Sequence, residues 1–397
     1  MRTQSHELTL SYKPVVRLTI KLKAYVRIFL GRIIRTVLPL LIRNRRDNIN
    51  LADVRPKRIL LLNAAHIGDI VIATSLLPVL RSAYPDVEIG FAAASWSSAV
   101  LKKHPEIKWL HELDHWRLNR SRREWINKCK HYYQTRRATL KEIRQVKYDL
   151  SLSIYPCYPD FLDLAWQANI PIRIGFRQSI FASLATHLVD FPENPFIHQG
   201  VRQAEIFKPL GLNKMHLQKR KAFLPNMDAE AVHEVCALLN VKNLGGVRYR
   251  IIHPGSGAEN RELPPEFWRD IAIKLSNSTI IFTGKGAREA KNISKIITGL
   301  GNCINACDRL TWNALIAAIR NAEIVYGVES MVGHVASAVG TKCIMFYSGA
   351  AGVARWRPEG DSVTVYTNHL PCAPCMLGCE AMLCKDNTKF QDIVKLD

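Results

Sequence analysis

The segment RILLLNAAHIGDIVIATSLLPVLRSAYP, residues Arg58 to Pro85, indicates a strand, a tight loop and a helix in direct succession. Ile59 to Leu62 form an uninterrupted apolar run, which is typical of a strand covered on both faces in a parallel sheet. From Ile70 to Tyr84 apolar residues recur at helical spacing, with Pro78 as the one interior breaker. This succession predicts an α/β fold.

The loop of this segment holds Gly68 and Asp69. Gly68 permits a tight backbone turn, and Asp69 falls at the carboxyl end of the strand, where open α/β sheets bind their ligands. Asp is also a preferred capping residue at helix starts. Asp69 is therefore either a functional carboxylate or only a helix cap.

The chain of 397 residues is long enough for two domains with separate cores, and its 48% apolar and 22% charged residues fit an α/β enzyme. Fifty-five Lys and Arg against 34 Asp and Glu give a net charge of +21. Residues 1–50 and residues 117–147 carry most of this excess, with 11 basic and 2 acidic residues each. An anionic partner is expected: a membrane, a nucleic acid or a phosphorylated substrate. Ten cysteines without a cleavable secretory signal indicate a reducing compartment.

Residues 1–50 are predicted to form a basic amphipathic helical segment. Arg27, Arg32 and Arg35 interrupt its most apolar part, so no run reaches the roughly 18 to 20 uncharged residues that a membrane span needs. An in-plane helix on an anionic leaflet fits better. The alternative is a basic helix packed on the protein's own core.

Strand and helix patterns alternate from residue 58 to 176 and again from 249 to 347, which predicts two doubly wound domains that face each other. We expect the first domain over residues 51–225, the second over 226–370 and a tail over 371–397. The segment 117–147 is expected to be helical, and a strand bounded by proline is expected near Ala222 to Leu224.

Three loops of the second domain follow predicted strands. The first contains His253-Pro-Gly-Ser-Gly257 and Arg261, the second Gly284-Lys-Gly, and the third Glu329-Ser330 with His334 one helical turn further on. Glycine-rich loops let backbone N–H groups approach phosphate oxygens, although such loops are common in any doubly wound fold. Neither the dinucleotide fingerprint nor a Walker motif occurs.

Four groups of residues together resemble glycosyltransferase family 9, the ADP-heptose:lipopolysaccharide heptosyltransferases. They are Gly68-Asp69 with the Ala-Thr-x-Leu-Leu-Pro helix, the His253 loop with Arg261-Glu-Leu-Pro-Pro-Glu-Phe-Trp, Gly327-Val-Glu-Ser-Met-Val-Gly-His, and the Cys-Ala-Pro-Cys tail. The resemblance covers about residues 58 to 385. It implies the GT-B fold, two facing Rossmann-like domains of which the first holds the acceptor and the second the nucleotide sugar. It also implies inverting transfer with no required metal or cofactor.

By this resemblance Asp69 is the general base, and Arg261 stabilises the departing diphosphate. The resemblance implies donor contacts from the following residues: His253, Gly255, Ser256, Gly257, Gly284, Leu310, Glu329, Ser330, Met331 and His334. Two departures stand out. Arg261 replaces the lysine that is common in the family, and Glu329-Ser330-Met331 replaces Asp-Thr-Gly, which puts Met331 beside the expected sugar site and leaves the donor sugar open.

Four cysteines in the tail have compact spacing: Cys372, Cys375, Cys379 and Cys384. This spacing allows a tetrahedral thiolate site for zinc or an iron–sulfur cluster, local disulfides, or free thiols that pack the tail. Against a metal site, the resemblance implies that similar cysteines recur in the tail of a family that is not known for metal dependence, so no metal ligand is expected.

The resulting prediction is an inverting glycosyltransferase that moves heptose or a related sugar from an ADP-activated donor to a lipopolysaccharide core or a similar anionic glycolipid. It would act on the cytoplasmic leaflet of the inner membrane, as a peripheral protein. One alternative is a catalytically silent protein of the same fold that serves envelope glycan assembly. The other, favoured only by charge and interleaved aromatics, is a nucleic-acid-binding protein, and we expect no nucleic acid partner.

Overall fold

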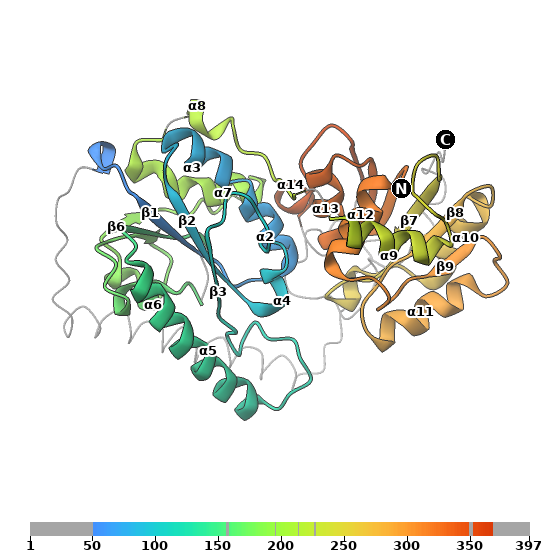
Figure 1. Ribbon diagram of the computed structural model, residues 1–397, viewed down its shortest axis with the longest axis horizontal. Coiled ribbons are helices and arrows are strands. Elements are labelled where there is room, and N and C mark those ends of the chain that lie inside the picture. The colour runs from blue at the N-terminus through green and yellow to red at the C-terminus, as the bar shows by residue number, and fades with distance from the viewer. Residues whose placement is uncertain are drawn as a thin grey trace, which may run out of the picture.

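The computed structural model describes residues 51–155, 159–194, 196–212, 214–225, 228–348 and 352–367. These residues form two six-stranded sheets that lie side by side, each flanked by helices (Figure 1). We call the parts built on the two sheets the first lobe and the second lobe. The predicted helical segment 1–50 and the cysteines Cys372, Cys375, Cys379 and Cys384 lie outside the described residues.

The first sheet is entirely parallel, with the strand order β3-β2-β1-β4-β5-β6. Its strands are β1 (Arg58–Leu62), β2 (Glu88–Ala93), β3 (Trp109–Glu112), β4 (Leu150–Ser153), β5 (Ile172–Phe176) and β6 (His187–Val189). The order reverses between β1 and β4, which makes that crevice the switch point where doubly wound sheets bind ligands.

Helices cover both faces of the first sheet, as the apolar run of β1 predicts. Ile59 and Leu61 pack on the side of α2 (Ile67–Thr74) and α3 (Leu77–Ala83). Leu60 and Leu62 pack on the opposite side, with α5 (Trp125–Val146) and α6 (Leu162–Gln167). Shorter helices complete the lobe: η1 (Leu51–Asp53), α4 (Ser95–Ser98), η2 (Ala182–Leu184), α7 (Gln199–Ala204), η3 (Glu205–Leu210) and α8 (Lys214–Leu217).

The second sheet repeats this topology in the order β12-β11-β10-β7-β8-β9. Its strands are β7 (Tyr249–His253), β8 (Thr279–Phe282), β9 (Cys303–Asn305), β10 (Val325–Val328), β11 (Cys343–Tyr347) and β12 (Val363–Thr367). One face carries α9 (Ala229–Leu239), α12 (Trp312–Asn321) and α13 (Met331–Val339), and the other carries α10 (Pro265–Lys274) and α11 (Ala287–Ile297). The short η4 (Glu259–Arg261) and α14 (Val353–Trp356) lie in loops. The switch point falls between β7 and β10.

The predicted fold class is confirmed, with local differences. Pro78 separates α2 from α3 and sits in the first turn of α3, where proline is tolerated. The strand expected at Ala222 to Leu224 is wrong, because these residues have no strand partner. In the basic segment 117–147 the helix begins only at Trp125.

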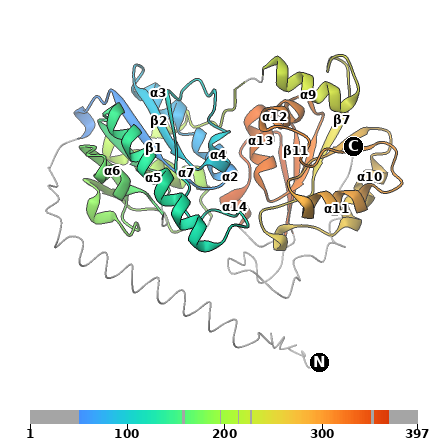
Figure 2. The ribbon, with the colours of Figure 1, turned by 60° about the horizontal axis from the view of Figure 1, so that its bottom comes forward.

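The lobes meet along α2 and α13, which face each other across the boundary in Figure 1 and remain adjacent in Figure 2. A β-carbon on Gly68 would lie 3.5 Å from His334 Cδ2 and 3.7 Å from Met331 Cα, so the two helix starts are in near contact. Further from the sheets, Glu359 of the second lobe accepts hydrogen bonds from Arg220 and contacts His198 Nδ1 at 3.1 Å. These polar contacts fix the lobes face to face.

A search of the described residues finds no helix whose length and hydropathy would let it cross a membrane.

Candidate active site

Both switch points open toward the boundary between the lobes, and the predicted site residues come from the loops there. Asp69 follows β1, Arg261 lies in the loop after β7, and Glu329 follows β10. Because these loops leave the carboxyl ends of parallel strands, their side chains gather at one edge of each sheet. The repeated topology thus sets a carboxylate of the first lobe against charged groups of the second.

Asp69 lies in the first turn of α2, where its Oδ2 accepts a hydrogen bond from the backbone N–H of His66 at 3.3 Å. Within the described part of the chain its Oδ1 accepts none. Burial raises the pKa of Asp69 to about 6, and the hydrogen bond from His66 opposes this shift. Asp69 therefore caps the helix through one oxygen only, and this capping role is compatible with a second role for the other oxygen.

Three guanidinium groups act electrostatically on Asp69: Arg120, Arg355 and Arg261. Arg120 comes from the loop before α5 in the first lobe, and Arg261 and Arg355 come from the second lobe. Arg120 also reaches the second lobe, because its guanidinium occupies the space that a β-carbon on Gly257 would need. Burial and the nearby Arg261 lower the pKa of Arg120. Cations therefore converge on the boundary from both lobes.

Glu329 and Ser330 line the second lobe's side of this space. Glu329 is 5% exposed and its Oε1 lies 3.4 Å from Arg261 Nη1. Burial raises the pKa of Glu329 to about 7. In the described part of the chain, Glu329 Oε2 and Ser330 Oγ are buried without a hydrogen-bond partner. These two unpartnered polar atoms belong to consecutive residues at the start of α13, and each could hydrogen-bond a hydroxyl group of a ligand.

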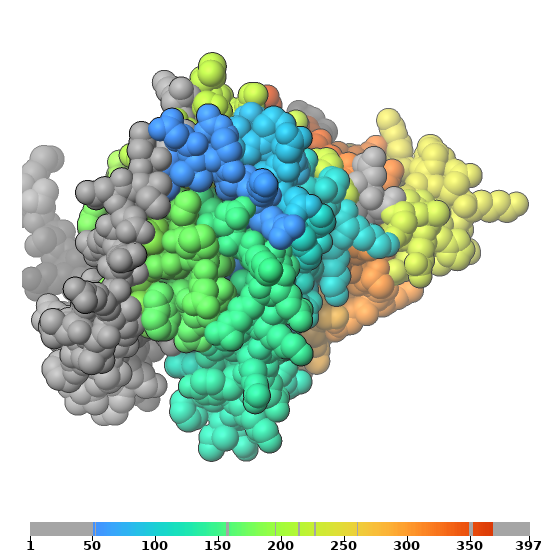
Figure 3. Space-filling model, turned by 60° about the vertical axis from the view of Figure 1, so that its left-hand side comes forward, coloured from blue at the N-terminus to red at the C-terminus, as the bar shows by residue number. Residues whose placement is uncertain are grey.

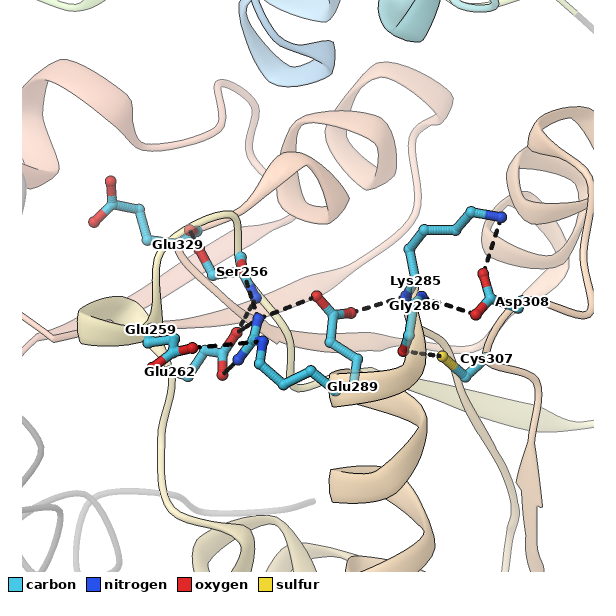
Figure 4. Close-up of polar contacts among 10 residues, drawn as sticks. Ser256, Glu259, Glu262, Lys285, Gly286, Glu289, Cys307, Asp308 and Glu329 are labelled. Carbon is cyan, nitrogen blue, oxygen red and sulfur yellow. Dashed lines mark hydrogen bonds and ion pairs between the residues drawn. The ribbon is translucent and has the colours of Figure 1, made fainter. Parts of the chain in front are cut away.

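The Gly255-Ser256-Gly257 loop differs from the sequence prediction. The Ser256 amide, expected to be free for phosphate, donates to Glu262 Oε1 at 2.8 Å, and Ser256 Oγ donates to the Glu329 carbonyl at 3.1 Å. Glu262 is in turn held by Arg288, whose Nη2 donates to it at 2.7 Å (Figure 4). The loop is thus braced by internal carboxylates, and the Ser256 amide is not available to a ligand.

The Gly284 loop is likewise satisfied internally. Lys285 N donates to Glu289 Oε2 at 2.9 Å, and Gly286 N donates to Asp308 Oδ2 at 2.8 Å. Lys285 Nζ pairs with Asp308 Oδ1 at 2.9 Å (Figure 4). In the same view the Glu329 side chain points away from this network. The amides of the Gly284 loop thus donate to Glu289 and Asp308, where phosphate oxygens were expected.

The remaining predicted residues occupy different settings. His253 is buried and hydrogen-bonded through Nδ1 to Thr283 Oγ1 at 2.9 Å, and burial lowers its pKa to about 4, so it is a neutral brace between β7 and β8. His334 faces Gly68, and burial lowers its pKa to about 4 as well. Leu310 packs, partly buried, against the apolar core.

Sequence reasoning missed Arg120, Glu262, Arg288 and Arg355. Arg120 is one of many cations in a basic segment, and only the facing lobe reveals which one reaches the boundary. Glu262 adjoins Arg261, which the sequence did indicate. Glu262 holds the Ser256 amide only because Arg288, from another helix, holds Glu262 in place. A carboxylate six residues after Ser256 was the one available signal.

Within the described residues no group of three or more His, Cys, Asp or Glu side chains is placed to hold a metal ion. The described cysteines are free thiols: Cys129, Cys236, Cys303, Cys307 and Cys343.

The family model "Glycosyltransferase family 9 (heptosyltransferase)" matches residues 136–384, and the chain belongs to this family of glycosyltransferases. Among curated proteins the chain is 22% identical over 312 residues to lipopolysaccharide heptosyltransferase 3 of Escherichia coli, which covers 75% of the chain and 84% of that protein. The family resemblance noted in the sequence is thereby confirmed, and the relatives act in lipopolysaccharide biosynthesis.

Solved structures share the fold. A family 9 glycosyltransferase from Veillonella parvula DSM 2008 superimposes with a TM-score of 0.67 at 18% identity, over 81% of this chain and 87% of that one. The E. coli ADP-heptose lipopolysaccharide heptosyltransferase II gives 0.62 at 17% identity, over 78% and 90%. E. coli heptosyltransferase WaaC with ADP gives 0.58 at 15% identity, over 78% and 93%. The GT-B-like architecture is thus common to all four.

Proposed function

We propose that this enzyme transfers heptose or a related sugar from an ADP-activated donor to a lipopolysaccharide core or a similar anionic glycolipid, with inversion at the anomeric carbon. The single observation that carries the proposal is that Arg261 of the second lobe acts electrostatically on Asp69 of the first lobe across the boundary. Relatives support the donor class, since WaaC structures hold ADP and ADP-2-deoxy-2-fluoro heptose.

Asp69 is proposed as the general base. Its carboxylate takes the proton of the acceptor hydroxyl while that oxygen attacks the anomeric carbon from the face opposite the nucleotide. The bond between the anomeric carbon and the diphosphate oxygen breaks in the same step, and ADP leaves with its electron pair. One displacement inverts the anomeric centre, so one base on the attacking side is sufficient. The proton then passes from Asp69 to solvent.

Cations stabilise the charge that develops on the leaving diphosphate. Arg261 is the proposed principal contact, and Arg120 and Arg355 add positive charge in the same space. The carboxyls that face them, Asp69 and Glu329, have pKa values raised to about 6 and about 7, so the site holds an excess of positive charge at neutral pH. Such a site favours an anion of two phosphates. Glu329 and Ser330 are proposed to bind hydroxyl groups of the donor.

The acceptor is proposed to approach from the first lobe, whose basic segment 117–147 suits an anionic glycolipid. A peripheral location on the cytoplasmic leaflet of the inner membrane follows from such an acceptor.

A thermal-shift and calorimetric comparison of ADP-, UDP-, GDP- and CDP-sugars tests the donor, followed by transfer to lipopolysaccharide cores of defined truncation. We expect stabilisation by ADP-heptose and by ADP, with an inverted product. Stabilisation by another nucleotide sugar and none by ADP-heptose would reject the donor assignment. Donor binding without transfer to any core would reject the acceptor class.

A further inference from the structure

Helix α5 presents a face that no other part of the described chain covers. Thr139 and Ile143 are buried against the first sheet, and Tyr132 and Leu140 pack beside them. The residues on the opposite side are exposed and follow one another at spacings of three and four, so they form one continuous stripe. This outer face consists of Ile126, Lys130, Tyr133, Arg137 and Lys141.

The outer face combines apolar tips with unpaired cations. Ile126 is 69% and Tyr133 68% exposed, and Trp125 beside them is 64% exposed. In the described part of the chain Lys130, Arg137 and Lys141 form no ion pair. Large apolar side chains clustered at this degree of exposure indicate a contact surface.

Charge decides what this surface contacts. Residues 117–147 hold 11 basic and 2 acidic residues, and of the two acids Glu142 is engaged by His111 Nδ1 at 2.9 Å. The segment 1–50 of the same chain is equally basic, so like-charge repulsion disfavours it as a cover for α5. A basic helix with Trp, Ile and Tyr on its exposed side is the pattern of an element that lies in the plane of an anionic bilayer.

The start of α5 lies close in sequence to the candidate active site, so a membrane contact of α5 would bring the site near the membrane. Arg120, five residues before Trp125, reaches Gly257 at the boundary between the lobes. The start of α5 and the site are thus joined by one short loop. Figure 1 shows the beginning of α5 projecting below the rest of the first lobe, and Figure 3 shows the helix running down the surface that faces the viewer.

We propose that the outer face of α5 is a docking surface for an anionic phospholipid bilayer, with its cations among the headgroups and Trp125, Ile126 and Tyr133 at the acyl boundary. Docked in this way, the short loop that joins Arg120 to the start of α5 lies next to the membrane. The proposal concerns binding to lipid alone and stands whichever sugar the enzyme transfers.

Vesicle flotation of the full chain tests it, on phosphatidylglycerol/phosphatidylcholine vesicles and on pure phosphatidylcholine vesicles, with no donor or acceptor present. The charge variant is Lys130→Ala/Arg137→Ala/Lys141→Ala. Its matched control, Lys242→Ala/Lys274→Ala/Lys291→Ala, removes the same charge from exposed, unpaired lysines of the second lobe. We expect the charge variant to lose at least tenfold in partitioning to the anionic vesicles and the control to lose less than twofold.

The apolar part is tested by Ile126→Ser/Tyr133→Ser, with exposed Ile273→Ser of the second lobe as control. The pair should weaken binding about fivefold or more and the control should not. Equal losses in both charge variants, or no loss in the α5 variant, would overturn the proposal. If the chain bound single-stranded RNA more tightly than anionic vesicles at physiological salt, and the same charge variant abolished that binding, the partner would be nucleic acid and the bilayer proposal would be wrong. Unchanged vesicle binding of Ile126→Ser/Tyr133→Ser would also refute the bilayer proposal. Melting curves confirm that each variant is folded.

Discussion

The guanidinium of Arg120, from the first lobe, lies where a side chain on Gly257 of the second lobe would begin. The absence of a β-carbon at Gly257 therefore lets one lobe place a cation in the other lobe's loop. This cation acts on Asp69 and on Arg261, so a glycine on one side of the boundary controls the electrostatics of the site on the other side.

Gly257→Ala is expected to displace Arg120 without unfolding the protein, because the displaced atoms are the end of a flexible side chain. We expect kcat/KM to fall about tenfold, as for the loss of one charge-assisted contact. Arg120→Ala should cost a similar factor, and the double variant should be no worse than Arg120→Ala alone. Steady-state kinetics of the three variants measures this coupling.

Gly301→Ala is the control for that series, since a β-carbon there meets no atom within 4 Å. It should leave kcat/KM unchanged. Additive losses in the double variant would show that Gly257 does not act through Arg120.

Ser330→Ala should separate stability from donor binding. Among the described residues the Ser330 hydroxyl is buried without a partner, so its removal relieves a desolvation cost and should leave Tm unchanged or higher. If the hydroxyl binds the donor, the donor KM should rise about five- to tenfold, with kcat changed less. Ser151→Ala, which removes another buried and unpaired hydroxyl in β4, should leave KM unchanged. Parallel behaviour of the two variants would refute the role of Ser330.

The pH profile follows from the raised pKa of Asp69. Burial moves it from the usual 3.8 to about 6, and only the carboxylate can accept a proton. The value of kcat/KM should therefore rise with pH through 6, level off above 7, and lose about tenfold per unit below 6. His66 and His334, with pKa values lowered to about 4, stay neutral across this range, whereas Glu329, with a pKa raised to about 7, ionises within it, so the limb is assigned to Asp69 by its position near pH 6. An acid limb near pH 4, in protein shown by its melting curve to be folded, would contradict the assignment.

The sequence predicted those parts of the fold that depend on local pattern. The apolar run of β1 was assigned correctly because a strand covered on both faces has no polar alternation. The edge strands β6, β9 and β12 were not predicted, since each is short or half-exposed and owes its conformation to the neighbouring strand. The opposite error occurs at Ala222 to Leu224. These residues have a strand-like pattern, but in the described part of the chain no neighbouring strand pairs with them.

The site was predictable where each residue lies in a motif of its own. Asp69 and its loop, and Arg261 beside Glu329, come from motifs that the sequence displays, and their approach follows from two sheets of the same topology. The bracing of Ser256 by Glu262 and Arg288, and the reach of Arg120, depend on side-chain contacts across elements. No local pattern encodes such contacts.

The central claim is that Asp69 deprotonates the acceptor hydroxyl, which attacks a donor held by the second lobe. It is tested most directly by Asp69→Asn with two readouts. The asparagine keeps an oxygen for the His66 amide, and because the raised pKa makes the buried carboxylate costly above pH 6, Tm at pH 8 should not fall. We predict that calorimetry gives a Kd for ADP within about twofold of the wild type, while ADP-heptose transfer falls at least 100-fold. Transfer within tenfold of the wild type, with ADP binding intact, would contradict the claim.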